Sequence, residues 1–311
     1  MSNEVKLDEI QKRIIEEVAD LHDVPLGAYN FRANSQLAGR NTTANIDIIS
    51  KEDGSGIDIR IKPGTVKESV HIPVVISESG IKETVYNDFY IGEDSDVVIV
   101  AGCGIDNCGS QDSQHDGIHR FYVGKNAKVK YVEKHYGSGK GDGKRILNPG
   151  TEVYMDEGST MEMEMVQIKG VDSTNRMTTG ELKAGARLIV RERLMTHQDQ
   201  TAISGYRVEL NGEGASADVV SRSVARDTSY QKFDACIVGN APCNGHTECD
   251  SIIMDQGRIL AVPSLEANDL DAMLVHEAAI GKIAGDQLIK LMTLGLTEAE
   301  AEEQIINGFL K

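Results

Sequence analysis

The feature that most constrains the fold of this 311-residue chain is a turn-and-strand pattern that recurs along its middle. Each copy has an apolar residue, a polar turn containing Gly, Asn or Ser, and then a new run of strand-forming residues. The copies begin at residues 91 (IGEDSDVVIV), 123 (VGKNAKVKYV), 155 (MDEGSTMEME), 182 (LKAGARLIVR), 210 (LNGEGASADVV) and 254 (MDQGRILAVP). Starts 32, 32, 27, 28 and 44 positions apart indicate stacked units of similar size.

A period of this kind is typical of a solenoid, in which each coil covers the open apolar face of the coil before it. The preceding segment NIDIISKEDGSGIDIRIKPGT alternates Ile with polar residues, which predicts strands separated by Gly-rich turns. Since no helical stretch interrupts the repeats, a β-helix fits better than a helical repeat. A β-sandwich is the alternative that the repeats alone leave open.

Helical patterns appear at both ends of the chain. Residues 5–21 place Val5, Ile10, Ile14, Val18 and Leu21 near the period of an amphipathic helix. Near the other end, residues 286–295 predict a short helix. Thr297 and Glu300 form a capping box that would open a second helix. The apolar face of this helical hairpin comprises Leu288, Leu291, Ile305 and Phe309.

These patterns divide the chain into a helical segment at 1–40, a β-helix core at 41–270 and a C-terminal helical segment at 271–311. The net charge of −17 and the absence of Trp argue against nucleic-acid binding, because such proteins concentrate Lys and Arg. No apolar run approaches the roughly 20 residues that a membrane-spanning helix needs. The charged N-terminal stretch lacks the features of a signal peptide, so we expect a cytoplasmic protein.

Three familiar catalytic motifs fail on inspection. His276-Glu277 opens a zinc-protease pattern, but Ile280 stands where the second histidine is needed. The loop GSGKGDGKR has Ser138 and Arg145 at two positions that a nucleotide-binding P-loop cannot vary. No Gly-x-Ser-x-Gly elbow is present. We therefore expect that the chain does not hydrolyse ATP itself.

The cysteines are the remaining candidates for chemistry. Five cysteines in a reducing compartment make a disulfide framework the least favoured interpretation. Cys103, Cys108, His115 and His119 match no common zinc spacing, and we interpret them as structural thiols and hydrogen-bonded histidines.

A second group of candidate ligands lies later in the chain, where Cys243, His246 and Cys249 fall within seven residues. A simple zinc site would need a fourth ligand from elsewhere. The downstream pair His276 and Glu277 makes metal binding more plausible, because a thiolate, an imidazole and a carboxylate together suit iron. An incomplete ligand set would suit an iron–sulfur cluster that has to be released.

The C-terminal run GHTECDSIIMDQGRILAVPSLEANDLDAMLVHEAAIGKIAGDQLIKLMTLGLTEAEAEEQIINGFL resembles the core of the SufB/SufD family, the scaffold subunits of the SUF iron–sulfur cluster assembly system. The resemblance extends upstream through CGSQDSQHDGIHRFYVGKNAKVKYVEKHYG and covers about residues 30–311. It implies a right-handed parallel β-helix with helical ends. It also implies that the C-terminal helices dock a separate ABC-type ATPase, SufC.

The resemblance also assigns roles to individual residues. Cys249 matches the SufB cysteine that receives sulfur and anchors the nascent cluster. Glu277 matches a SufB glutamate implicated in the same site, and His276 aligns with a histidine used by SufD. The short N-terminal region lacks the additional cysteine-rich motif of longer bacterial SufB. The chain is therefore most similar to the compact SufB-like form of archaea and anaerobic bacteria.

The resemblance predicts a non-enzymatic scaffold that carries a transient cluster, of the [4Fe–4S] type, and delivers it to apoprotein recipients. Neighbouring residues on a strand point to opposite faces, so His276 and Glu277 can both meet one Cys249 only if the chain bends. We therefore expect a homodimer formed through the β-helix, with Cys249 of one chain facing His276 or Glu277 of the other.

Two alternatives from other classes remain. One is a structural subunit that holds the ATPase without carrying a cluster, and the other is a carbohydrate-active β-helix protein. The roles of Cys103, Cys108, Cys236, Cys243 and His246 are left open by the sequence.

Overall fold

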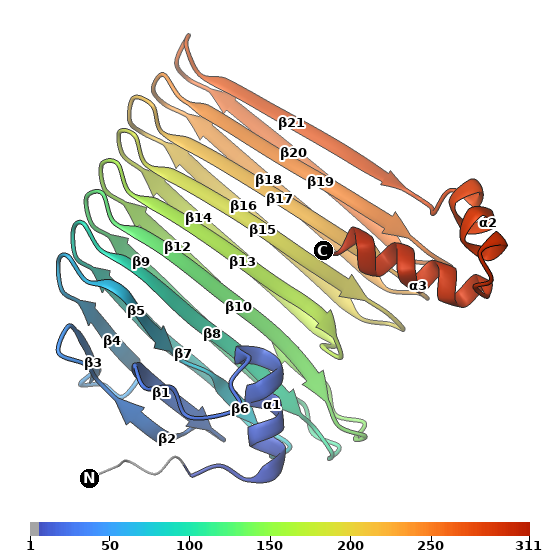
Figure 1. Ribbon diagram of the computed structural model, residues 1–311, viewed down its shortest axis with the longest axis horizontal. Helices are drawn as coiled ribbons and strands as arrows, with labels where there is room; N and C mark the ends of the chain where they lie inside the picture. The colour runs from blue at the N-terminus through green and yellow to red at the C-terminus, as the bar shows by residue number, and fades with distance from the viewer. Residues whose placement is uncertain (1–5) are drawn as a thin grey trace.

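The computed structural model describes residues 6–311 and shows a parallel β-helix of about eight turns, with helices near both ends (Figure 1). This confirms the predicted solenoid. The proposed start of the first helix at Val5 lies outside the described residues. Among residues 6–311, no helix combines the length and the apolar character that are needed to span a membrane.

Two sheets run along the solenoid, and each coil contributes strands to both. In spatial order the first sheet contains β2 (Gln36–Asn41), β1 (Ala28–Ala33), β5 (Val66–His71), β8 (Asp96–Asp106), β10 (Lys128–Ser138), β13 (Thr160–Lys169), β15 (Arg187–Thr196), β17 (Ser216–Ala225), β19 (Asn244–Ile253) and β21 (Met273–Gly281), with β6 (Val74–Ile76) pairing with β1 and β8.

The second sheet faces the first across the core. It contains β20 (Arg258–Ala267), β18 (Tyr230–Gly239), β16 (Thr201–Leu210), β14 (Ser173–Leu182), β11 (Arg145–Leu147), β9 (Ser113–Val123), β7 (Lys82–Ile91), β4 (Gly56–Ile61) and β3 (Ile46–Ser50), with β12 (Gly150–Met155) pairing with β9 and β14. Pairing is parallel except for β1 with β2 and β3 with β4, which are antiparallel. The helices are α1 (Glu9–Ala19), α2 (Gly285–Thr293) and α3 (Glu298–Phe309).

The repeated turns that were visible in the sequence stack along one edge of the solenoid. The matches beginning at 91, 123, 155, 182 and 210 all connect a strand of the second sheet to a strand of the first. Each turn places one residue at positive φ, and these residues are Asp94, Asn126, Gly158, Gly185 and Gly214. Asn, Asp and Gly tolerate this left-handed conformation, which explains the composition of the turns.

The sixth match, at 254, belongs to a different turn. It connects β19 of the first sheet to β20 of the second, at the opposite edge of the solenoid. The interval of 44 residues before it is therefore not a coil length. The residues between β18 and β19, 240–243, make the corresponding sixth turn without the sequence pattern.

Strands extend beyond both expected domain boundaries. β1 and nearly all of β2 lie within the segment expected to be helical, 1–40, yet both belong to the first sheet. β21 lies within the C-terminal segment expected to be helical, 271–311, yet it is the last strand of the same sheet. The helical parts are accordingly confined to α1 at one end and to α2 with α3 at the other.

The helices meet the solenoid to different extents. Ile14 and Val18 of α1 are fully buried, and Gly102 and Gly104 of β8 leave the space into which they pack. In α3, Ile306 and Leu310 just beyond it pack on Val224 and Met254. The predicted capping box is confirmed, since Thr297 and Glu300 cap each other at the start of α3. No residue of α2 is buried.

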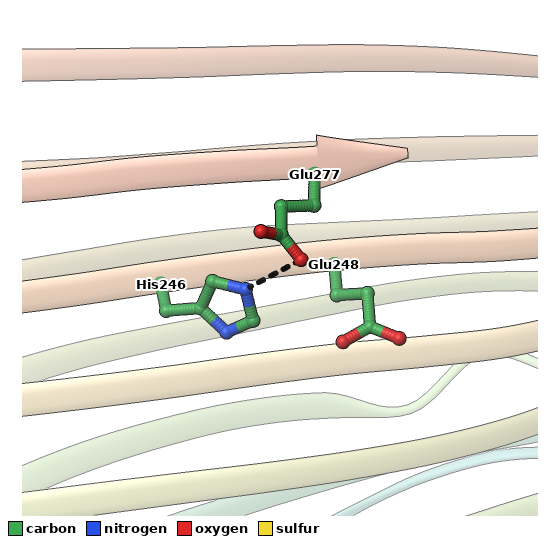
Figure 2. Close-up of side chains that lie close together, drawn as sticks. All are labelled: His246, Glu248 and Glu277. Atoms are coloured by element: carbon green, nitrogen blue, oxygen red, sulfur yellow. Dashed lines mark ion pairs between the residues drawn. The ribbon is translucent and has the colours of Figure 1, made fainter. Parts of the chain in front are cut away.

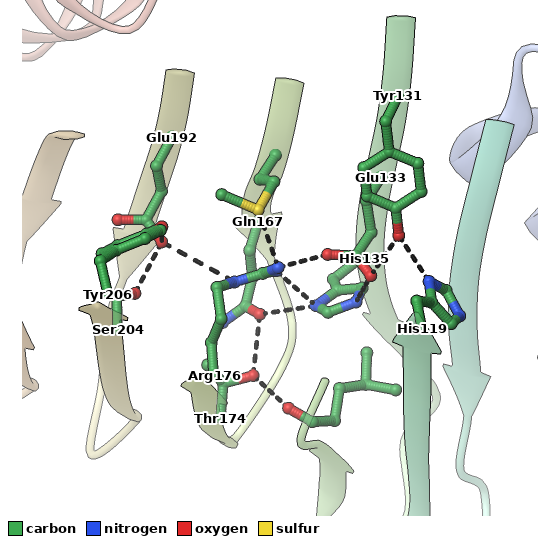
Figure 3. A network of polar contacts seen from close by, with 12 residues as sticks. His119, Tyr131, Glu133, His135, Gln167, Thr174, Arg176, Glu192, Ser204 and Tyr206 are labelled. Carbon is green, nitrogen blue, oxygen red and sulfur yellow. Dashed lines mark hydrogen bonds and ion pairs between the residues drawn. The ribbon is translucent and has the colours of Figure 1, made fainter. Parts of the chain in front are cut away.

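A buried polar strip interrupts the apolar core (Figure 3). Arg176 on β14 forms ion pairs with Glu133 on β10 and with Glu192 on β15. Ser204 and Tyr206 donate hydrogen bonds to Glu192 at 2.6 and 2.9 Å. Burial alone would raise the pKa of Glu133, but the Arg176 guanidinium and His135 hold it well below its ordinary value.

Candidate functional site

Cys249 lies in the middle of β19 with its side chain directed into the solenoid. It is only 1% exposed, and the residues on either side of it face outward. Its Sγ lies 3.7 Å from Ser251 Oγ, and Ser251 is bonded in turn to Ser223 at 2.9 Å. Burial raises the pKa of the Cys249 thiol. A bound metal ion would itself promote loss of the thiol proton.

His276 occupies the neighbouring strand on the same face as Cys249. In the register of β19 with β21, His276 pairs with Thr247, and Thr247 faces inward like Cys249. His276 Nδ1 and Thr247 Oγ1 are 2.6 Å apart. Strand spacing puts the α-carbons of Cys249 and His276 about 8 Å apart. Partial burial, and then His246, lowers the pKa of His276 and favours the neutral imidazole that binds metals.

Glu277 points the other way. It pairs with Glu248 in the register of β19 with β21, and both side chains are on the outer face of the first sheet. Glu277 is exposed, and its Oε2 lies 3.8 Å from His246 Nε2. Neighbours on β21 thus face opposite sides, as expected, and the sheet separates Glu277 from the Cys249 of its own chain.

The last coil of the solenoid is open among the described residues. β20 and β21 are the outermost strands of their sheets, so each has an edge without a strand partner. Leu265 of β20 and Ile280 of β21 are aligned with buried inward residues of the previous coil, yet both are exposed. The apolar interior of the β-helix therefore reaches the surface one strand beyond Cys249.

The other cysteines form no disulfide. Cys243 is buried in the core. Cys108 Sγ lies 3.2 Å from Asp106 Oδ1, and Cys236 Sγ lies 3.4 Å from Arg207 Nη1. Cys103 is buried beside His115; burial raises its pKa, but His115 and then His135 bring it down to about 7.

The two histidines of the upstream group are hydrogen-bonded, as predicted. His115 Nδ1 lies 2.9 Å from Glu83 Oε1, and His119 Nδ1 lies 2.7 Å from the hydroxyl of Tyr131.

The sequence interpretation missed the surroundings of His246. That residue pairs in register with Asp218, one coil earlier, and their side chains are 2.8 Å apart. The spacing of 28 residues between them, one coil length, was the available signal.

Comparison with known proteins connects the chain to one family. The family described as SUF system FeS cluster assembly, SufBD core domain, matches residues 82–309. The chain belongs to the SufBD family. The matched SufBD region includes Cys249, His276 and Glu277 and leaves α1 outside.

Archaeal relatives of the SufBD core are named iron–sulfur cluster assembly SufBD family proteins. One from Methanothermobacter thermautotrophicus is 30% identical over 82% of this chain and 62% of its own length. One from Archaeoglobus fulgidus is 31% identical over 84% of this chain and 69% of its own. One from Methanocaldococcus jannaschii is 30% identical over 84% and 82%. The matching region thus spans less than two thirds of the first of these relatives.

Proposed function

We propose that this SufBD protein is a scaffold on which an iron–sulfur cluster is assembled at Cys249 and then transferred to apoproteins. The observation that carries the proposal is the position of Cys249, which faces inward one strand from the open end and shares that face with His276. A thiolate and an imidazole are suitable iron ligands, and two protein ligands leave a cluster exchangeable. We propose a transient [4Fe–4S] cluster.

The open end supports the homodimer proposal. Two chains that meet end to end would pair their free strand edges and bury the apolar side chains exposed there. In such a dimer, the inward-facing His276 of the partner chain would share the interior face with Cys249, whereas Glu277 would stay on the outer face of the joined sheets. The cluster would then lie between two chains, where separation of the chains would release it.

A separate SufC-type ATPase would drive the separation of the two chains. The supporting observation is the exposed face of α2, where Ile289 is 61% exposed and Met292 is also exposed, with the exposed Leu294 directly after the helix. Exposed apolar side chains gathered on one short helix are typical of protein interfaces. α2 directly follows β21, so a movement of the docked helix would act on the strand that carries His276 and Glu277.

The docking proposal is tested by Ile289→Glu, which places a charge on the exposed face of α2. We expect binding of the ATPase, measured by calorimetry, to weaken at least tenfold. The matched control is Ile10→Glu on α1, where the isoleucine is also exposed, at 44%. Equal loss of binding in both variants, or in neither, would contradict docking at α2.

The scaffold proposal is tested by comparing Cys249→Ser with Cys243→Ser. Both cysteines are buried in the same core, so the two substitutions disturb packing similarly. After anaerobic reconstitution with the ATPase, we expect Cys249→Ser to lack the iron–sulfur charge-transfer absorption and Cys243→Ser to retain it. Normal loading of Cys249→Ser would refute the assignment. The family match favours neither a cluster-free structural subunit nor a carbohydrate-active protein.

A further inference from the structure

Three potential metal ligands meet on the outer face of the first sheet, away from Cys249 (Figure 2). His246 and Glu248 are alternate residues of β19, and Glu277 is the register partner of Glu248 on β21. One ligand atom from each side chain lies within 4.8 Å of the others. A single ion can bridge atoms at such separations after small rotations of the carboxylates, since metal–ligand bonds to nitrogen and oxygen are about 2.0–2.2 Å.

The imidazole of His246 is already oriented for binding. Its Nδ1 lies 2.8 Å from Asp218 Oδ1, and Asp218 is held by Arg191 at 2.5 Å. A carboxylate at Nδ1 accepts the ring proton and leaves the lone pair of Nε2 free. Nε2 is the atom that faces Glu277. Metal-binding histidines characteristically have such a carboxylate partner behind the ring, which fixes both tautomer and orientation.

The carboxylates of the group lie close to another acidic side chain. Asp250 is two residues from Glu248 on the same outward face of β19, and its register partner one coil earlier is Arg222. Glu277 approaches the same space from the adjacent strand. A bound divalent cation would relieve the repulsion between these acidic groups.

We propose that His246, Glu248 and Glu277 bind one divalent first-row metal ion per chain, with Asp218 as the positioning residue. One imidazole and two carboxylates without a thiolate suit Fe²⁺ and Mn²⁺, and the exposed side leaves coordination positions for water. Zn²⁺ would compete, because affinities rise along the first-row series. The scaffold proposal gives no role to His246 or Glu248, so variants of these two residues test the metal site alone.

The test is a Mn²⁺ titration of the chelator-treated full chain, with free Mn²⁺ measured by electron paramagnetic resonance. Mn²⁺ is chosen because it prefers oxygen and nitrogen ligands, so the cysteines contribute little. We expect one ion per chain, and at least tenfold weaker binding in His246→Gln and in Glu248→Gln. The control Glu266→Gln removes an exposed carboxylate on β20 of the same coil and leaves binding unchanged.

Two further variants separate positioning and cluster roles from metal binding. Asp218→Asn is expected to weaken binding by about 10–100-fold although it removes no ligand. Cys249→Ser is expected to bind Mn²⁺ normally while it fails to load a cluster. Wild-type protein that binds no Mn²⁺ above the level of Glu248→Gln would overturn the site. Equal affinity of the wild type and His246→Gln, with unchanged circular dichroism, would overturn it as well.

Discussion

At the scale of single residues, the alternation of side chains along a strand places the potential metal ligands on two opposite faces of the first sheet. Cys249 and His276 face the interior, whereas His246, Glu248 and Glu277 face outward. One strand pair therefore presents a thiol with an imidazole on one side and an imidazole with two carboxylates on the other. The two sets are close in sequence and separated by a single sheet, so substitutions can address each of them independently.

Glu83 provides a residue-scale prediction about pH. Burial alone would raise its pKa, but its hydrogen bonds with His115 and Arg32 lower the pKa from 4.5 to about 2. A lowered carboxylate pKa stabilises the fold above the unfolded value, and this contribution is lost as pH falls from 4.5 towards 2. We expect the difference in urea midpoint between wild type and Glu83→Gln to be large near about pH 6 and smaller near about pH 3.5. A difference independent of pH would contradict this interpretation.

At the scale of elements, the buried polar strip ties β10, β14 and β15 together across the core (Figure 3). Arg176 is shared by Glu133 and Glu192, and the hydroxyls of Ser204, Tyr206 and Ser221 complete the partners of Glu192. Buried charges are tolerated only when they are paired and hydrogen-bonded. The strip therefore constrains which strands of the two sheets can face each other.

Arg176→Met should be strongly destabilising for this reason. It leaves Glu133 and Glu192 buried without their cation, and breaking a buried ion pair in this way costs about 3–5 kcal/mol. The free energy of unfolding in urea measures the loss. Arg187→Met, at the exposed start of β15, is the control and should change stability by less than about 0.5 kcal/mol. Similar losses in the two variants would show that the strip has no special role.

At the scale of the whole molecule, the solenoid has two unlike ends. At one end, α1 packs beside the first coils, and β3 and β4 pair antiparallel. At the other end, β20 and β21 leave their edges and the apolar interior uncovered, while α2 and α3 lie to one side (Figure 1). Repeat proteins generally need a cap at each end to remain unassociated. The uncapped end is consequently where we expect the second chain.

Ile280→Arg tests association through that end. Ile280 is 41% exposed and aligns with the inward Ser251 of the previous coil, so the substitution places a charge where the second chain would pack. We expect the dimer to become a monomer, as measured by size-exclusion chromatography with light scattering. Ile49→Arg on β3, where the isoleucine is 50% exposed at the opposite end, should remain dimeric. A monomeric wild type, or a dimeric Ile280→Arg, would refute the proposed interface.

The sequence by itself determined the stacking of coils, the strands between turns and the helical hairpin at the C-terminal end. Its repeats reflect the left-handed turn positions at Asp94, Asn126 and Gly158, and the Thr297 capping box is a local interaction. Local signals of this kind survive in sequence because they depend on residues within a few positions of one another.

Only the tertiary structure decided which residues of different coils meet. Asp218, His246 and Glu277 come together because successive strands of the first sheet are in register at offsets of 28 and 29 residues. Turn lengths and core packing set those offsets, and a slip of one residue would move Glu277 to the inner face. Alternation fixes the face of each residue within one strand, but the register between strands belongs to the folded solenoid.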